Sequence, residues 1–314
     1  MKPDVLIAGS LMPHVTAALE AAYTTHDLLK APDRQAMLQV VGPKARAIAT
    51  STFDGCSIAL MDACPALEIV SSFGVGVDSL NVDHARSRGV IVANTPDVLN
   101  DDVANMGVAL VLATTRNIVA NDRYVREGRW RREGDPPLAR GIAGKRVGIV
   151  GFGRIGRAIA TKLGVFGCEI VYHTRNAQPD QPFTHYPDLV AMARDCALLV
   201  VITPGGAATR NLINRAVMDA LGPEGILVNV ARGSVVDEPA LVAALQEGTL
   251  GGAGLDVFAD EPNVPEALFS MQNVVLQPHQ ASATVETRRA MGDLVVTNLA
   301  AYFEGRLEDI KRVC

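Results

Sequence analysis

Aromatic residues make up only 4% of the 314-residue chain, which has a single tryptophan. The five cysteines are odd in number and widely spaced, with no CxxC pair or Cys/His spacing, so neither disulfides nor a metal site are expected. Apolar runs such as residues 197–202 are far shorter than the roughly 20 residues that cross a bilayer. No basic leader or small-residue cleavage site is visible. We therefore expect a reduced, cytoplasmic protein that binds no metal and no membrane.

The chain also lacks an excess of positive charge. Its formal net charge is −5, which argues against nucleic acid or an anionic membrane as the main partner. The exception is a local cluster of arginines, interleaved only with Tyr124 and Trp130. The cluster consists of Arg123, Arg126, Arg129, Arg131 and Arg132. We expect a solvated helix end or a contact between subunits there, with no nucleic acid bound.

What the chain does have is a regular alternation of short apolar runs and helical stretches. Predicted strands cover residues 4–9, 46–51, 67–74, 89–95, 146–153 (with a turn at the end), 169–175, 197–203, 225–231, 252–258 and 273–279. Predicted helices cover residues 13–23, 101–130, 154–167 and a last stretch from about residue 284, and residues 132–145 form a loop. This alternation predicts an α/β protein with parallel sheets.

A glycine-rich turn joins one of these strands to the next helix. Gly151, Gly153 and Gly156 form a GxGxxG pattern in the context strand, turn, helix. Such glycines permit, in order, the tight turn, the approach of a pyrophosphate to the backbone, and close packing of helix on strand. The amides of Arg154 and Ile155 would point at the anion from the helix N-terminus. The pattern predicts a dinucleotide site, and the alternative is a structural turn without a ligand.

The acid that usually binds the ribose hydroxyls of NAD is missing. It is expected about 20 residues after the glycine turn, where residues 171–176 read VYHTRN. Arg175 can hold a phosphate through two donors, while Thr174 and Asn176 add neutral donors. We therefore expect NADP(H) to be preferred, with NAD(H) possible. The alternative is that Arg175 is a solvated charge in a tolerant site.

Three charged or titratable residues follow three further predicted strands. Arg232, Glu261 and His279 come just after the strands that end near residues 231, 258 and 279. Ligands of open α/β sheets bind at the carboxyl ends of the strands. Arg232 would hold the carboxylate of a 2-keto acid and polarise its ketone, and His279 would donate a proton as hydride arrives. Glu261 beside His279 would favour the imidazolium and fix its orientation.

Taken together, these motifs resemble the D-2-hydroxyacid dehydrogenase family. The resemblance runs from about residue 45 to residue 300 and rests on SSFGVGVD (71–78), NTPDVLNDDVAN (94–105), VGIVGFGRIG (147–156), VNVARGSVVDE (228–238), GAGLDVFADEP (252–262) and NVVLQPHQAS (273–282). Within the family, the chain is most similar to glyoxylate/hydroxypyruvate reductases and plant hydroxyphenylpyruvate reductases. The resemblance implies an NAD(P)-dependent oxidoreductase that reduces small 2-keto acids, glyoxylate and hydroxypyruvate, to D-2-hydroxy acids with NADPH.

Two alternatives stay open at this point. The substrate could instead be 2-ketogluconate or hydroxyphenylpyruvate, because the sequence does not say which side chains set the width of the pocket. The family also includes transcriptional corepressors that keep the catalytic residues. A nucleotide-sensing binding protein is therefore the non-enzymatic alternative.

The resemblance also implies roles for residues outside the catalytic set. The loop 73–76 would bind the substrate carboxylate through the amides of Val75 and Gly76. Thr209 would lie near the cofactor phosphates, and Asp256 near the nicotinamide amide. Trp130 would belong to a loop that reaches the pocket of a neighbouring subunit in a homodimer.

The fold implied by the resemblance consists of two doubly wound parallel-sheet domains. A Rossmann NADP-binding domain, residues 100–285, is inserted in a flavodoxin-like substrate domain, residues 1–99 plus 286–314. The chain departs from the family pattern at Asn105, where many members carry Glu, and at Gln280 after the histidine. We expect both departures to adjust local hydrogen bonding without abolishing catalysis.

Overall fold

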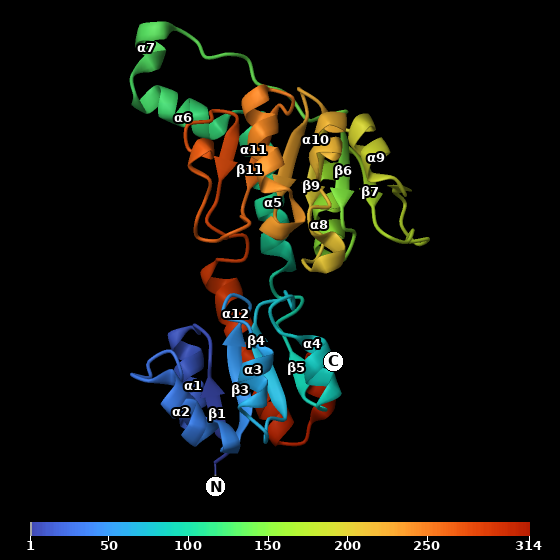
Figure 1. Ribbon diagram of the computed structural model, residues 1–314. Helices are drawn as coiled ribbons and strands as arrows, with labels where there is room; N and C mark the ends of the chain where they lie inside the picture. Colours follow the sequence, from blue (N-terminus) through green and yellow to red (C-terminus); the bar gives the residue numbers. More distant parts are fainter. Residues whose placement is uncertain (1) are drawn as a thin grey trace. The chain divides into compact units, whose positions relative to one another are not determined.

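The computed structural model describes residues 2–314, which form two compact units (Figure 1). The first unit combines Met1–Leu99 with Ala283–Cys314, and the second is Asn100–Ser282. The sequence prediction placed the two boundaries after residues 99 and 285. The role of the first unit as the substrate domain stays a prediction.

The first unit is built around a five-stranded parallel sheet in the order β2-β1-β3-β4-β5. Its strands are β1 (Asp4–Ile7), β2 (Thr24–Asp27), β3 (Ala45–Ser51), β4 (Ile69–Phe73) and β5 (Ile91–Ala93). Its helices are α1 (Pro13–Ala22), α2 (Arg34–Val41), α3 (Ile58–Asp62), α4 (Val82–Ser87) and α12 (Val285–Phe303). This strand order is that of a flavodoxin-like doubly wound sheet, which confirms the predicted fold.

Apolar side chains from the helices cover this sheet. Leu6 and Ile48 of the strands pack with Met61 of α3 in one buried cluster. The last long helix, α12, packs on β4 and α1. Its side chains Val295 and Leu299 are completely buried. The predicted packing of the C-terminal helix on a core is therefore confirmed.

The second unit contains a seven-stranded parallel sheet in the order β12-β11-β10-β9-β6-β7-β8. Its strands are β6 (Arg146–Val150), β7 (Glu169–His173), β8 (Thr184–His185), β9 (Leu198–Val201), β10 (Ile226–Asn229), β11 (Gly252–Leu255) and β12 (Val274–Leu276). Its helices are α5 (Asn100–Thr115), α6 (Ile118–Arg126), α7 (Arg129–Glu133), α8 (Arg154–Val165), α9 (Leu189–Asp195), α10 (Arg215–Leu221) and α11 (Glu238–Glu247). From β6 the chain adds β7 and β8 on one side, and it then returns to add β9 to β12 on the other side of β6. This is the strand order of a Rossmann fold with one additional strand. The predicted fold is confirmed here too.

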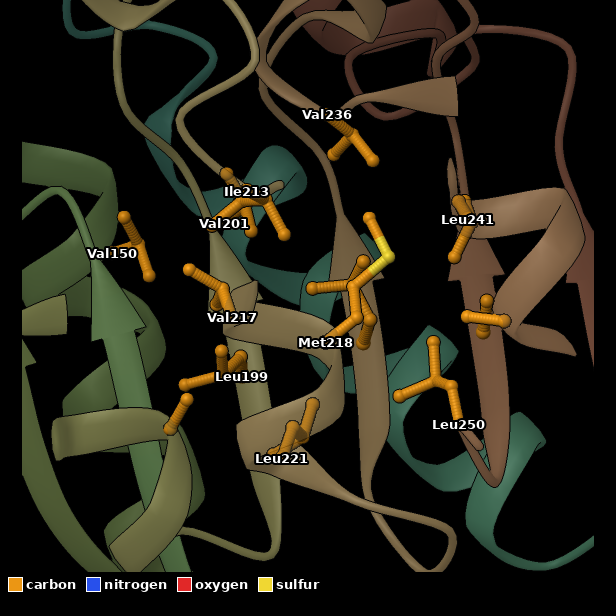
Figure 2. Packing of buried hydrophobic residues seen from close by; sticks show 14 of the residues in the cluster. Val150, Leu199, Val201, Ile213, Val217, Met218, Leu221, Val236, Leu241 and Leu250 are labelled. Carbon is orange, nitrogen blue, oxygen red and sulfur yellow. The ribbon is translucent and has the colours of Figure 1, made fainter. Parts of the chain in front are cut away.

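The central strands of this sheet are buried on both faces, which explains their continuous apolar runs. Figure 2 shows one face, where Leu199 and Val201 of β9 pack against Val217 and Met218 of α10. The helix α5 lies behind the sheet in this view and contacts α8, β10 and β11. Several helices begin where a side chain accepts a hydrogen bond from an amide three residues ahead. These capping residues are Asp33, Ser57, Asp188, Asn214, Asp237 and Thr284.

The prediction of a single long helix over residues 101–130 is wrong. The chain forms α5, α6 and α7 instead, and α6 is bent by 58° from α5. The breaks fall at Asn117 and Gly128, both of which have left-handed backbones with φ of 52° and 67°. Asparagine and glycine tolerate this conformation better than other residues. The apolar periodicity continues across both breaks, so the sequence pattern did not indicate them.

The prediction also left out two strands that carry little apolar character. β2 reads TTHD, and β8 has only two residues. Both lie at sheet edges, where a strand is half covered and its sequence is correspondingly polar. Among residues 2–314, no single helix is long and apolar enough to cross a membrane, and α5 with α6 passes that test only as a bent pair.

Candidate active site

All seven strands of the second unit end at one edge of its sheet. Because all pairs are parallel, the loops that follow β6, β7, β9, β10, β11 and β12 emerge at this carboxyl edge. The strand order reverses between β6 and β9. Open α/β sheets bind ligands at such a reversal. All predicted cofactor-binding and catalytic residues belong to this unit, whereas the predicted substrate-binding residues Val75 and Gly76 belong to the first unit.

The glycine turn after β6 has the geometry that a dinucleotide requires. Gly151 has φ of +96°, and a Cβ there would lie 2.8 Å from the backbone of Thr203. A Cβ on Gly156 would lie 2.3 Å from the carbonyl oxygen of Gly151, so this glycine permits close packing of α8. Apart from Gly153 itself and its two chain neighbours, no residue has an atom within 4 Å of a Cβ position there. That open space leaves the backbone accessible to a pyrophosphate, and the residues fit the group.

The helix α8 begins directly after this turn. Gly153 is its N-cap and supplies no side-chain hydrogen bond to the first turn. The amides of Arg154 and Ile155 therefore lie at a helix N-terminus with no side-chain cap from Gly153, which suits an anion. Their contact with the cofactor stays a prediction.

Arg175 follows β7 and is exposed. Among residues 2–314, its guanidinium has no ion-pair or hydrogen-bond partner, and no acid stands beside it in the stretch VYHTRN. The hydroxyl of Thr174 donates to the carbonyl of Asn176 at 2.7 Å. Thr174 therefore shapes the loop as well as being a candidate ligand. Thr209 lies in the loop after β9, where its hydroxyl donates to the carbonyl of Pro204 at 2.7 Å.

The loop after β10 presents Arg232. Asn229, the last residue of that strand, donates from Nδ2 to the Arg232 carbonyl at 3.0 Å and accepts from the Ala231 amide at 3.0 Å. Arg232 is half-buried, and its Nη1 donates to the carbonyl of Ala231 at 2.7 Å. The buried asparagine thus holds the backbone from which the arginine projects.

Glu261 and His279 form a close pair. The carboxylate oxygen Oε2 of Glu261 lies 2.7 Å from Nδ1 of His279, and both side chains are about three-quarters buried. The second oxygen, Oε1, accepts a hydrogen bond from the Phe258 amide at 3.0 Å. The sequence prediction that these two residues meet agrees with this geometry, and their catalytic roles stay proposals.

The electrostatics of Glu261 favour its charged form. Burial alone would raise the pKa of Glu261, but the hydrogen bond with His279, the Phe258 amide and the charges of His279 and Arg232 together lower it. The charge of Arg232 therefore acts on the same carboxylate that binds His279. An arginine, a carboxylate and an imidazole at one sheet edge can hold an anionic keto acid and deliver a proton to it.

His279 has an unusual backbone, and Asp256 binds the two residues that follow it. The φ of His279 is +54°, a left-handed conformation that is costly for a side chain with a Cβ. The Asp256 carboxylate, which is completely buried, accepts hydrogen bonds from the amides of Gln280 (2.7 Å) and Ala281 (3.1 Å). Burial raises the pKa of Asp256, and these two amides act in the opposite direction. The predicted contact of Asp256 with the nicotinamide amide stays a prediction.

Two residues that the sequence prediction did not single out hold the loop of Glu261. A Cβ on Gly233 would lie 1.9 Å from the backbone of Phe258, so the loops after β10 and β11 touch at this glycine. The carboxylate of Glu238 accepts a hydrogen bond from the Ala259 amide at 3.0 Å. Both residues are part of the motif VNVARGSVVDE, but their partners lie on another strand.

In the first unit, the predicted carboxylate-binding loop follows β4. Gly74 has φ of +131°, its amide donates to Thr95 Oγ1 at 3.0 Å, and Asn94 Nδ2 donates to the Val75 carbonyl at 2.9 Å. Val75 and Gly76 are half-buried, and among residues 2–314 their amides have no hydrogen-bond partner. Two successive amides of this kind suit an anion. Within the same residues, no group of three or more His, Cys, Asp or Glu could hold a metal ion.

Comparison with known families agrees with this arrangement. Residues 108–281 match the family described as D-isomer specific 2-hydroxyacid dehydrogenase, NAD binding domain. The chain belongs to the D-isomer specific 2-hydroxyacid dehydrogenases. The second unit is thus the NAD-binding domain of an oxidoreductase.

Several relatives of this dehydrogenase cover almost its whole length. It is 47% identical over 302 residues to a 2-ketogluconate reductase of Gluconobacter oxydans, with 96% of each chain covered. It is 46% identical to a hydroxyphenylpyruvate reductase of Plectranthus scutellarioides, again with 96% of each chain covered. A crystal structure of an NADPH-dependent glyoxylate/hydroxypyruvate reductase from Sinorhizobium meliloti, in complex with NADP and malonate, matches with a TM-score of 0.89 and 47% identity, covering 96% of this chain and 94% of that one.

The two departures from the family pattern lie at exposed side chains. Asn105 is exposed on α5. Gln280 uses its backbone amide to bind Asp256, while its side chain is exposed and donates only to the Pro278 carbonyl at 3.3 Å. Another side chain at this position therefore keeps the same bond to Asp256.

Proposed function

We propose that this protein reduces small 2-keto acids, glyoxylate and hydroxypyruvate above all, to D-2-hydroxy acids with NADPH. The observation that carries the proposal is the 2.7 Å pair of Glu261 and His279 at the carboxyl edge of an NAD-binding sheet. The charge of Arg232 acts on the same pair. Similarity to named reductases of 2-keto acids supports this choice of substrate class.

Each residue then has a defined task. The bound cofactor supplies the hydride. Arg232 binds the substrate carboxylate and polarises the keto group. The amides of Val75 and Gly76 in the first unit are further candidate donors to an anion. His279, whose Nδ1 is committed to Glu261, holds the transferable proton at Nε2 and donates it to the keto oxygen. The Glu261 carboxylate stabilises the imidazolium and fixes the orientation of the ring.

The preference for NADPH rests on Arg175. Arg175 is exposed and follows β7, the strand paired with the strand before the glycine turn, and the stretch VYHTRN contains no acid to repel a 2′-phosphate. A guanidinium binds phosphate through two parallel hydrogen bonds. The similar Sinorhizobium meliloti enzyme is NADPH-dependent and was crystallised with NADP.

The proposal is tested by measuring kcat/KM for glyoxylate, hydroxypyruvate, 2-ketogluconate and phenylpyruvate with NADPH and with NADH. We expect the highest values for glyoxylate and hydroxypyruvate with NADPH.

Arg175→Met should raise the KM for NADPH about tenfold or more, since a hydrogen bond to a charged group contributes roughly 1.5–3 kcal/mol. The matched control Arg194→Met removes an exposed arginine on α9 and should change the KM of neither NADPH nor NADH. Absence of turnover across the panel contradicts the proposed activity.

A second candidate substrate is 2-ketogluconate. The Gluconobacter oxydans relative at 47% identity is named for that activity. A larger keto acid uses the same arginine, carboxylate and histidine, so the catalytic residues do not separate the two substrates. The ratio of kcat/KM for 2-ketogluconate and glyoxylate in the same panel decides between them.

We further propose that the enzyme acts as a homodimer through α6 and α7. These helices expose Val125 and Trp130, with 54% and 57% of their surface accessible, and Leu138 in the following loop is 97% exposed. Exposed apolar side chains concentrated on one segment are typical of protein interfaces. Analytical ultracentrifugation should give twice the chain mass, and the double variant Val125→Asp and Leu138→Asp should shift the protein to monomers. A monomer in the unmodified protein contradicts this proposal.

A further inference from the structure

Gln178 connects the loop of Arg175 to the glycine turn. It lies half-buried in the segment between β7 and β8. Its Nε2 donates to the carbonyl of Phe152, the central residue of the turn Gly151–Gly153, at 3.0 Å. Its Oε1 accepts from Nη2 of Arg157 on α8 at 2.9 Å. One amide side chain thus bridges the turn and the helix that bind the pyrophosphate in the proposed complex.

The backbone of Gln178 is anchored as well. Its amide donates to the hydroxyl of Tyr172 at 2.9 Å, and that hydroxyl donates to the Gln178 carbonyl at 3.2 Å. The Tyr172 ring is almost completely buried and stacks on Phe152, with ring centroids 4.4 Å apart. The loop is therefore fixed to the strand β7 as well as to the turn and to α8. Between these anchors and the end of β7, residues 175–177 are exposed.

We infer that Gln178 is a positioning residue that holds the loop of Arg175 against the glycine turn and thereby determines selectivity for a dinucleotide with a 2′-phosphate. This inference rests on the proposed use of NADPH. A loop that is already ordered loses less conformational entropy when its arginine binds a phosphate. NADH has no 2′-phosphate and does not use Arg175, so its binding gains little from this order. Gln178 does not contact the phosphate itself.

Dissociation constants of NADP⁺ and NAD⁺, measured by calorimetry, test the inference together with hydrogen exchange of the cofactor-free protein. Gln178→Met removes both amide contacts and keeps a side chain of similar length. The matched control Gln181→Met replaces an amide in the same loop whose side chain makes no hydrogen bond within residues 2–314. Arg157→Met removes one partner of Gln178 from the other side and serves as the second variant should Gln178→Met fold poorly.

We expect Gln178→Met to weaken NADP⁺ binding about five- to tenfold, which corresponds to the loss of about one hydrogen bond that orders the loop of Arg175. The affinity for NAD⁺ should stay within about twofold of that of the unmodified protein. Residues 174–183 should exchange amide hydrogens faster in this variant, and Gln181→Met should match the unmodified protein in both measurements. Arg157→Met should show a smaller change in the same direction.

The outcomes separate this inference from the proposed cofactor preference. If Arg175→Met lowers NADP⁺ affinity while Gln178→Met and Arg157→Met do not, the preference stands and the positioning role of Gln178 is wrong. If Gln178→Met weakens NADP⁺ and NAD⁺ equally, the residue supports the turn in general, and its role in selectivity is wrong. If Arg175→Met leaves NADP⁺ affinity unchanged, the proposed preference and this inference both fail.

Discussion

The buried carboxylate of Asp256 holds the two backbone amides that directly follow His279. The contacts are 2.7 Å to the Gln280 amide and 3.1 Å to the Ala281 amide, and the His279 amide donates to the Asp256 carbonyl at 2.8 Å. His279 adopts a left-handed backbone between these bonds. Such a conformation costs of order 1–3 kcal/mol and persists only where surrounding contacts determine it. Asp256 therefore helps to fix the backbone conformation from which the imidazole projects.

Asp256→Asn should lower kcat about tenfold or more and leave cofactor affinity nearly unchanged. The asparagine has one acceptor oxygen, so one of the two amides faces an NH₂ group in a buried site, which costs roughly 1–3 kcal/mol. Steady-state kinetics and the dissociation constant of the cofactor measure the two effects. Asp260→Asn, an exposed acid in the same loop region, is the matched control. A large loss of cofactor affinity would instead favour the predicted contact of Asp256 with the nicotinamide amide.

His279→Ala should lower kcat for keto-acid reduction by roughly 10²–10⁴, the range that a positioned general acid contributes. Cofactor affinity should change little, because the imidazole acts on the substrate oxygen. The matched control is His84→Ala, which removes a histidine with a comparable 2.8 Å contact to Asp62 in the first unit. An equal loss of kcat and cofactor affinity would speak against His279 as the proton donor.

Gly233→Ala should destabilise the protein and reduce activity together. The added Cβ would lie 1.9 Å from the backbone of Phe258, so the loops of Arg232 and Glu261 have to separate. Overpacking of this kind costs roughly 1–3 kcal/mol. Gly164→Ala is the control, because the added Cβ has no atom within 4 Å outside its chain neighbours and the nearby backbone of α8, and alanine has the higher helix propensity. Thermal unfolding should show a lower Tm for the first variant alone, and an unchanged Tm would contradict the close contact.

Much of the fold and the site could be predicted because each motif is local. The strand, the glycine turn and the helix around Gly151 are consecutive in the chain. The structure has β6, a turn with a positive φ at Gly151, and α8 in the predicted order. Arg232, Glu261 and His279 each follow an apolar strand, and parallel strands bring their carboxyl ends to one edge. The apolar pattern of each strand, together with the shared carboxyl edge of parallel strands, was sufficient to predict that these three residues lie at one edge of the sheet.

The contacts that hold the site join residues far apart in sequence, and the pattern did not indicate them. Asp256 and Gln280 lie in the loops after the neighbouring strands β11 and β12, and Gln178 binds a residue 26 positions earlier. Such partners depend on register and loop conformation. The break at Asn117 was missed for a related reason, because the left-handed backbone there interrupts a helix without a proline.

Chemical modification should distinguish the cysteines by burial. Cys56, Cys64 and Cys196 are buried, and burial raises the pKa of Cys56 and of Cys196 to about 12. Since the thiolate is the reactive form, these thiols should react with a disulfide reagent only after unfolding. Cys168 and Cys314 are partly exposed and should account for all labelling of the native protein. Mass spectrometry of labelled peptides measures this, and rapid native labelling of Cys196 would contradict the packing around it.

Glu261→Gln should lower kcat about tenfold or more and leave cofactor affinity nearly unchanged. The two carboxylate oxygens of Glu261 contact Nδ1 of His279 and the Phe258 amide separately. A glutamine has one acceptor oxygen, so one of these two groups faces an NH₂ group instead, which costs roughly 1–3 kcal/mol. Steady-state kinetics measure the loss, and Glu266→Gln, which removes an exposed charge five residues further along the chain, should leave kcat unchanged.

The same variant has a defined effect on stability. The pKa of Glu261 is lowered in the folded protein relative to its ordinary value of 4.5. The carboxylate therefore contributes stability that is fully present above pH 4.5 and is lost as pH falls through the lowered folded value. Glu261→Gln should remove this dependence, so the two proteins should differ in unfolding free energy at neutral pH and converge as the solution is acidified. A constant difference across that acidic range would show that the charge of Glu261 does not stabilise the fold, and that its carboxylate serves His279 by orientation alone.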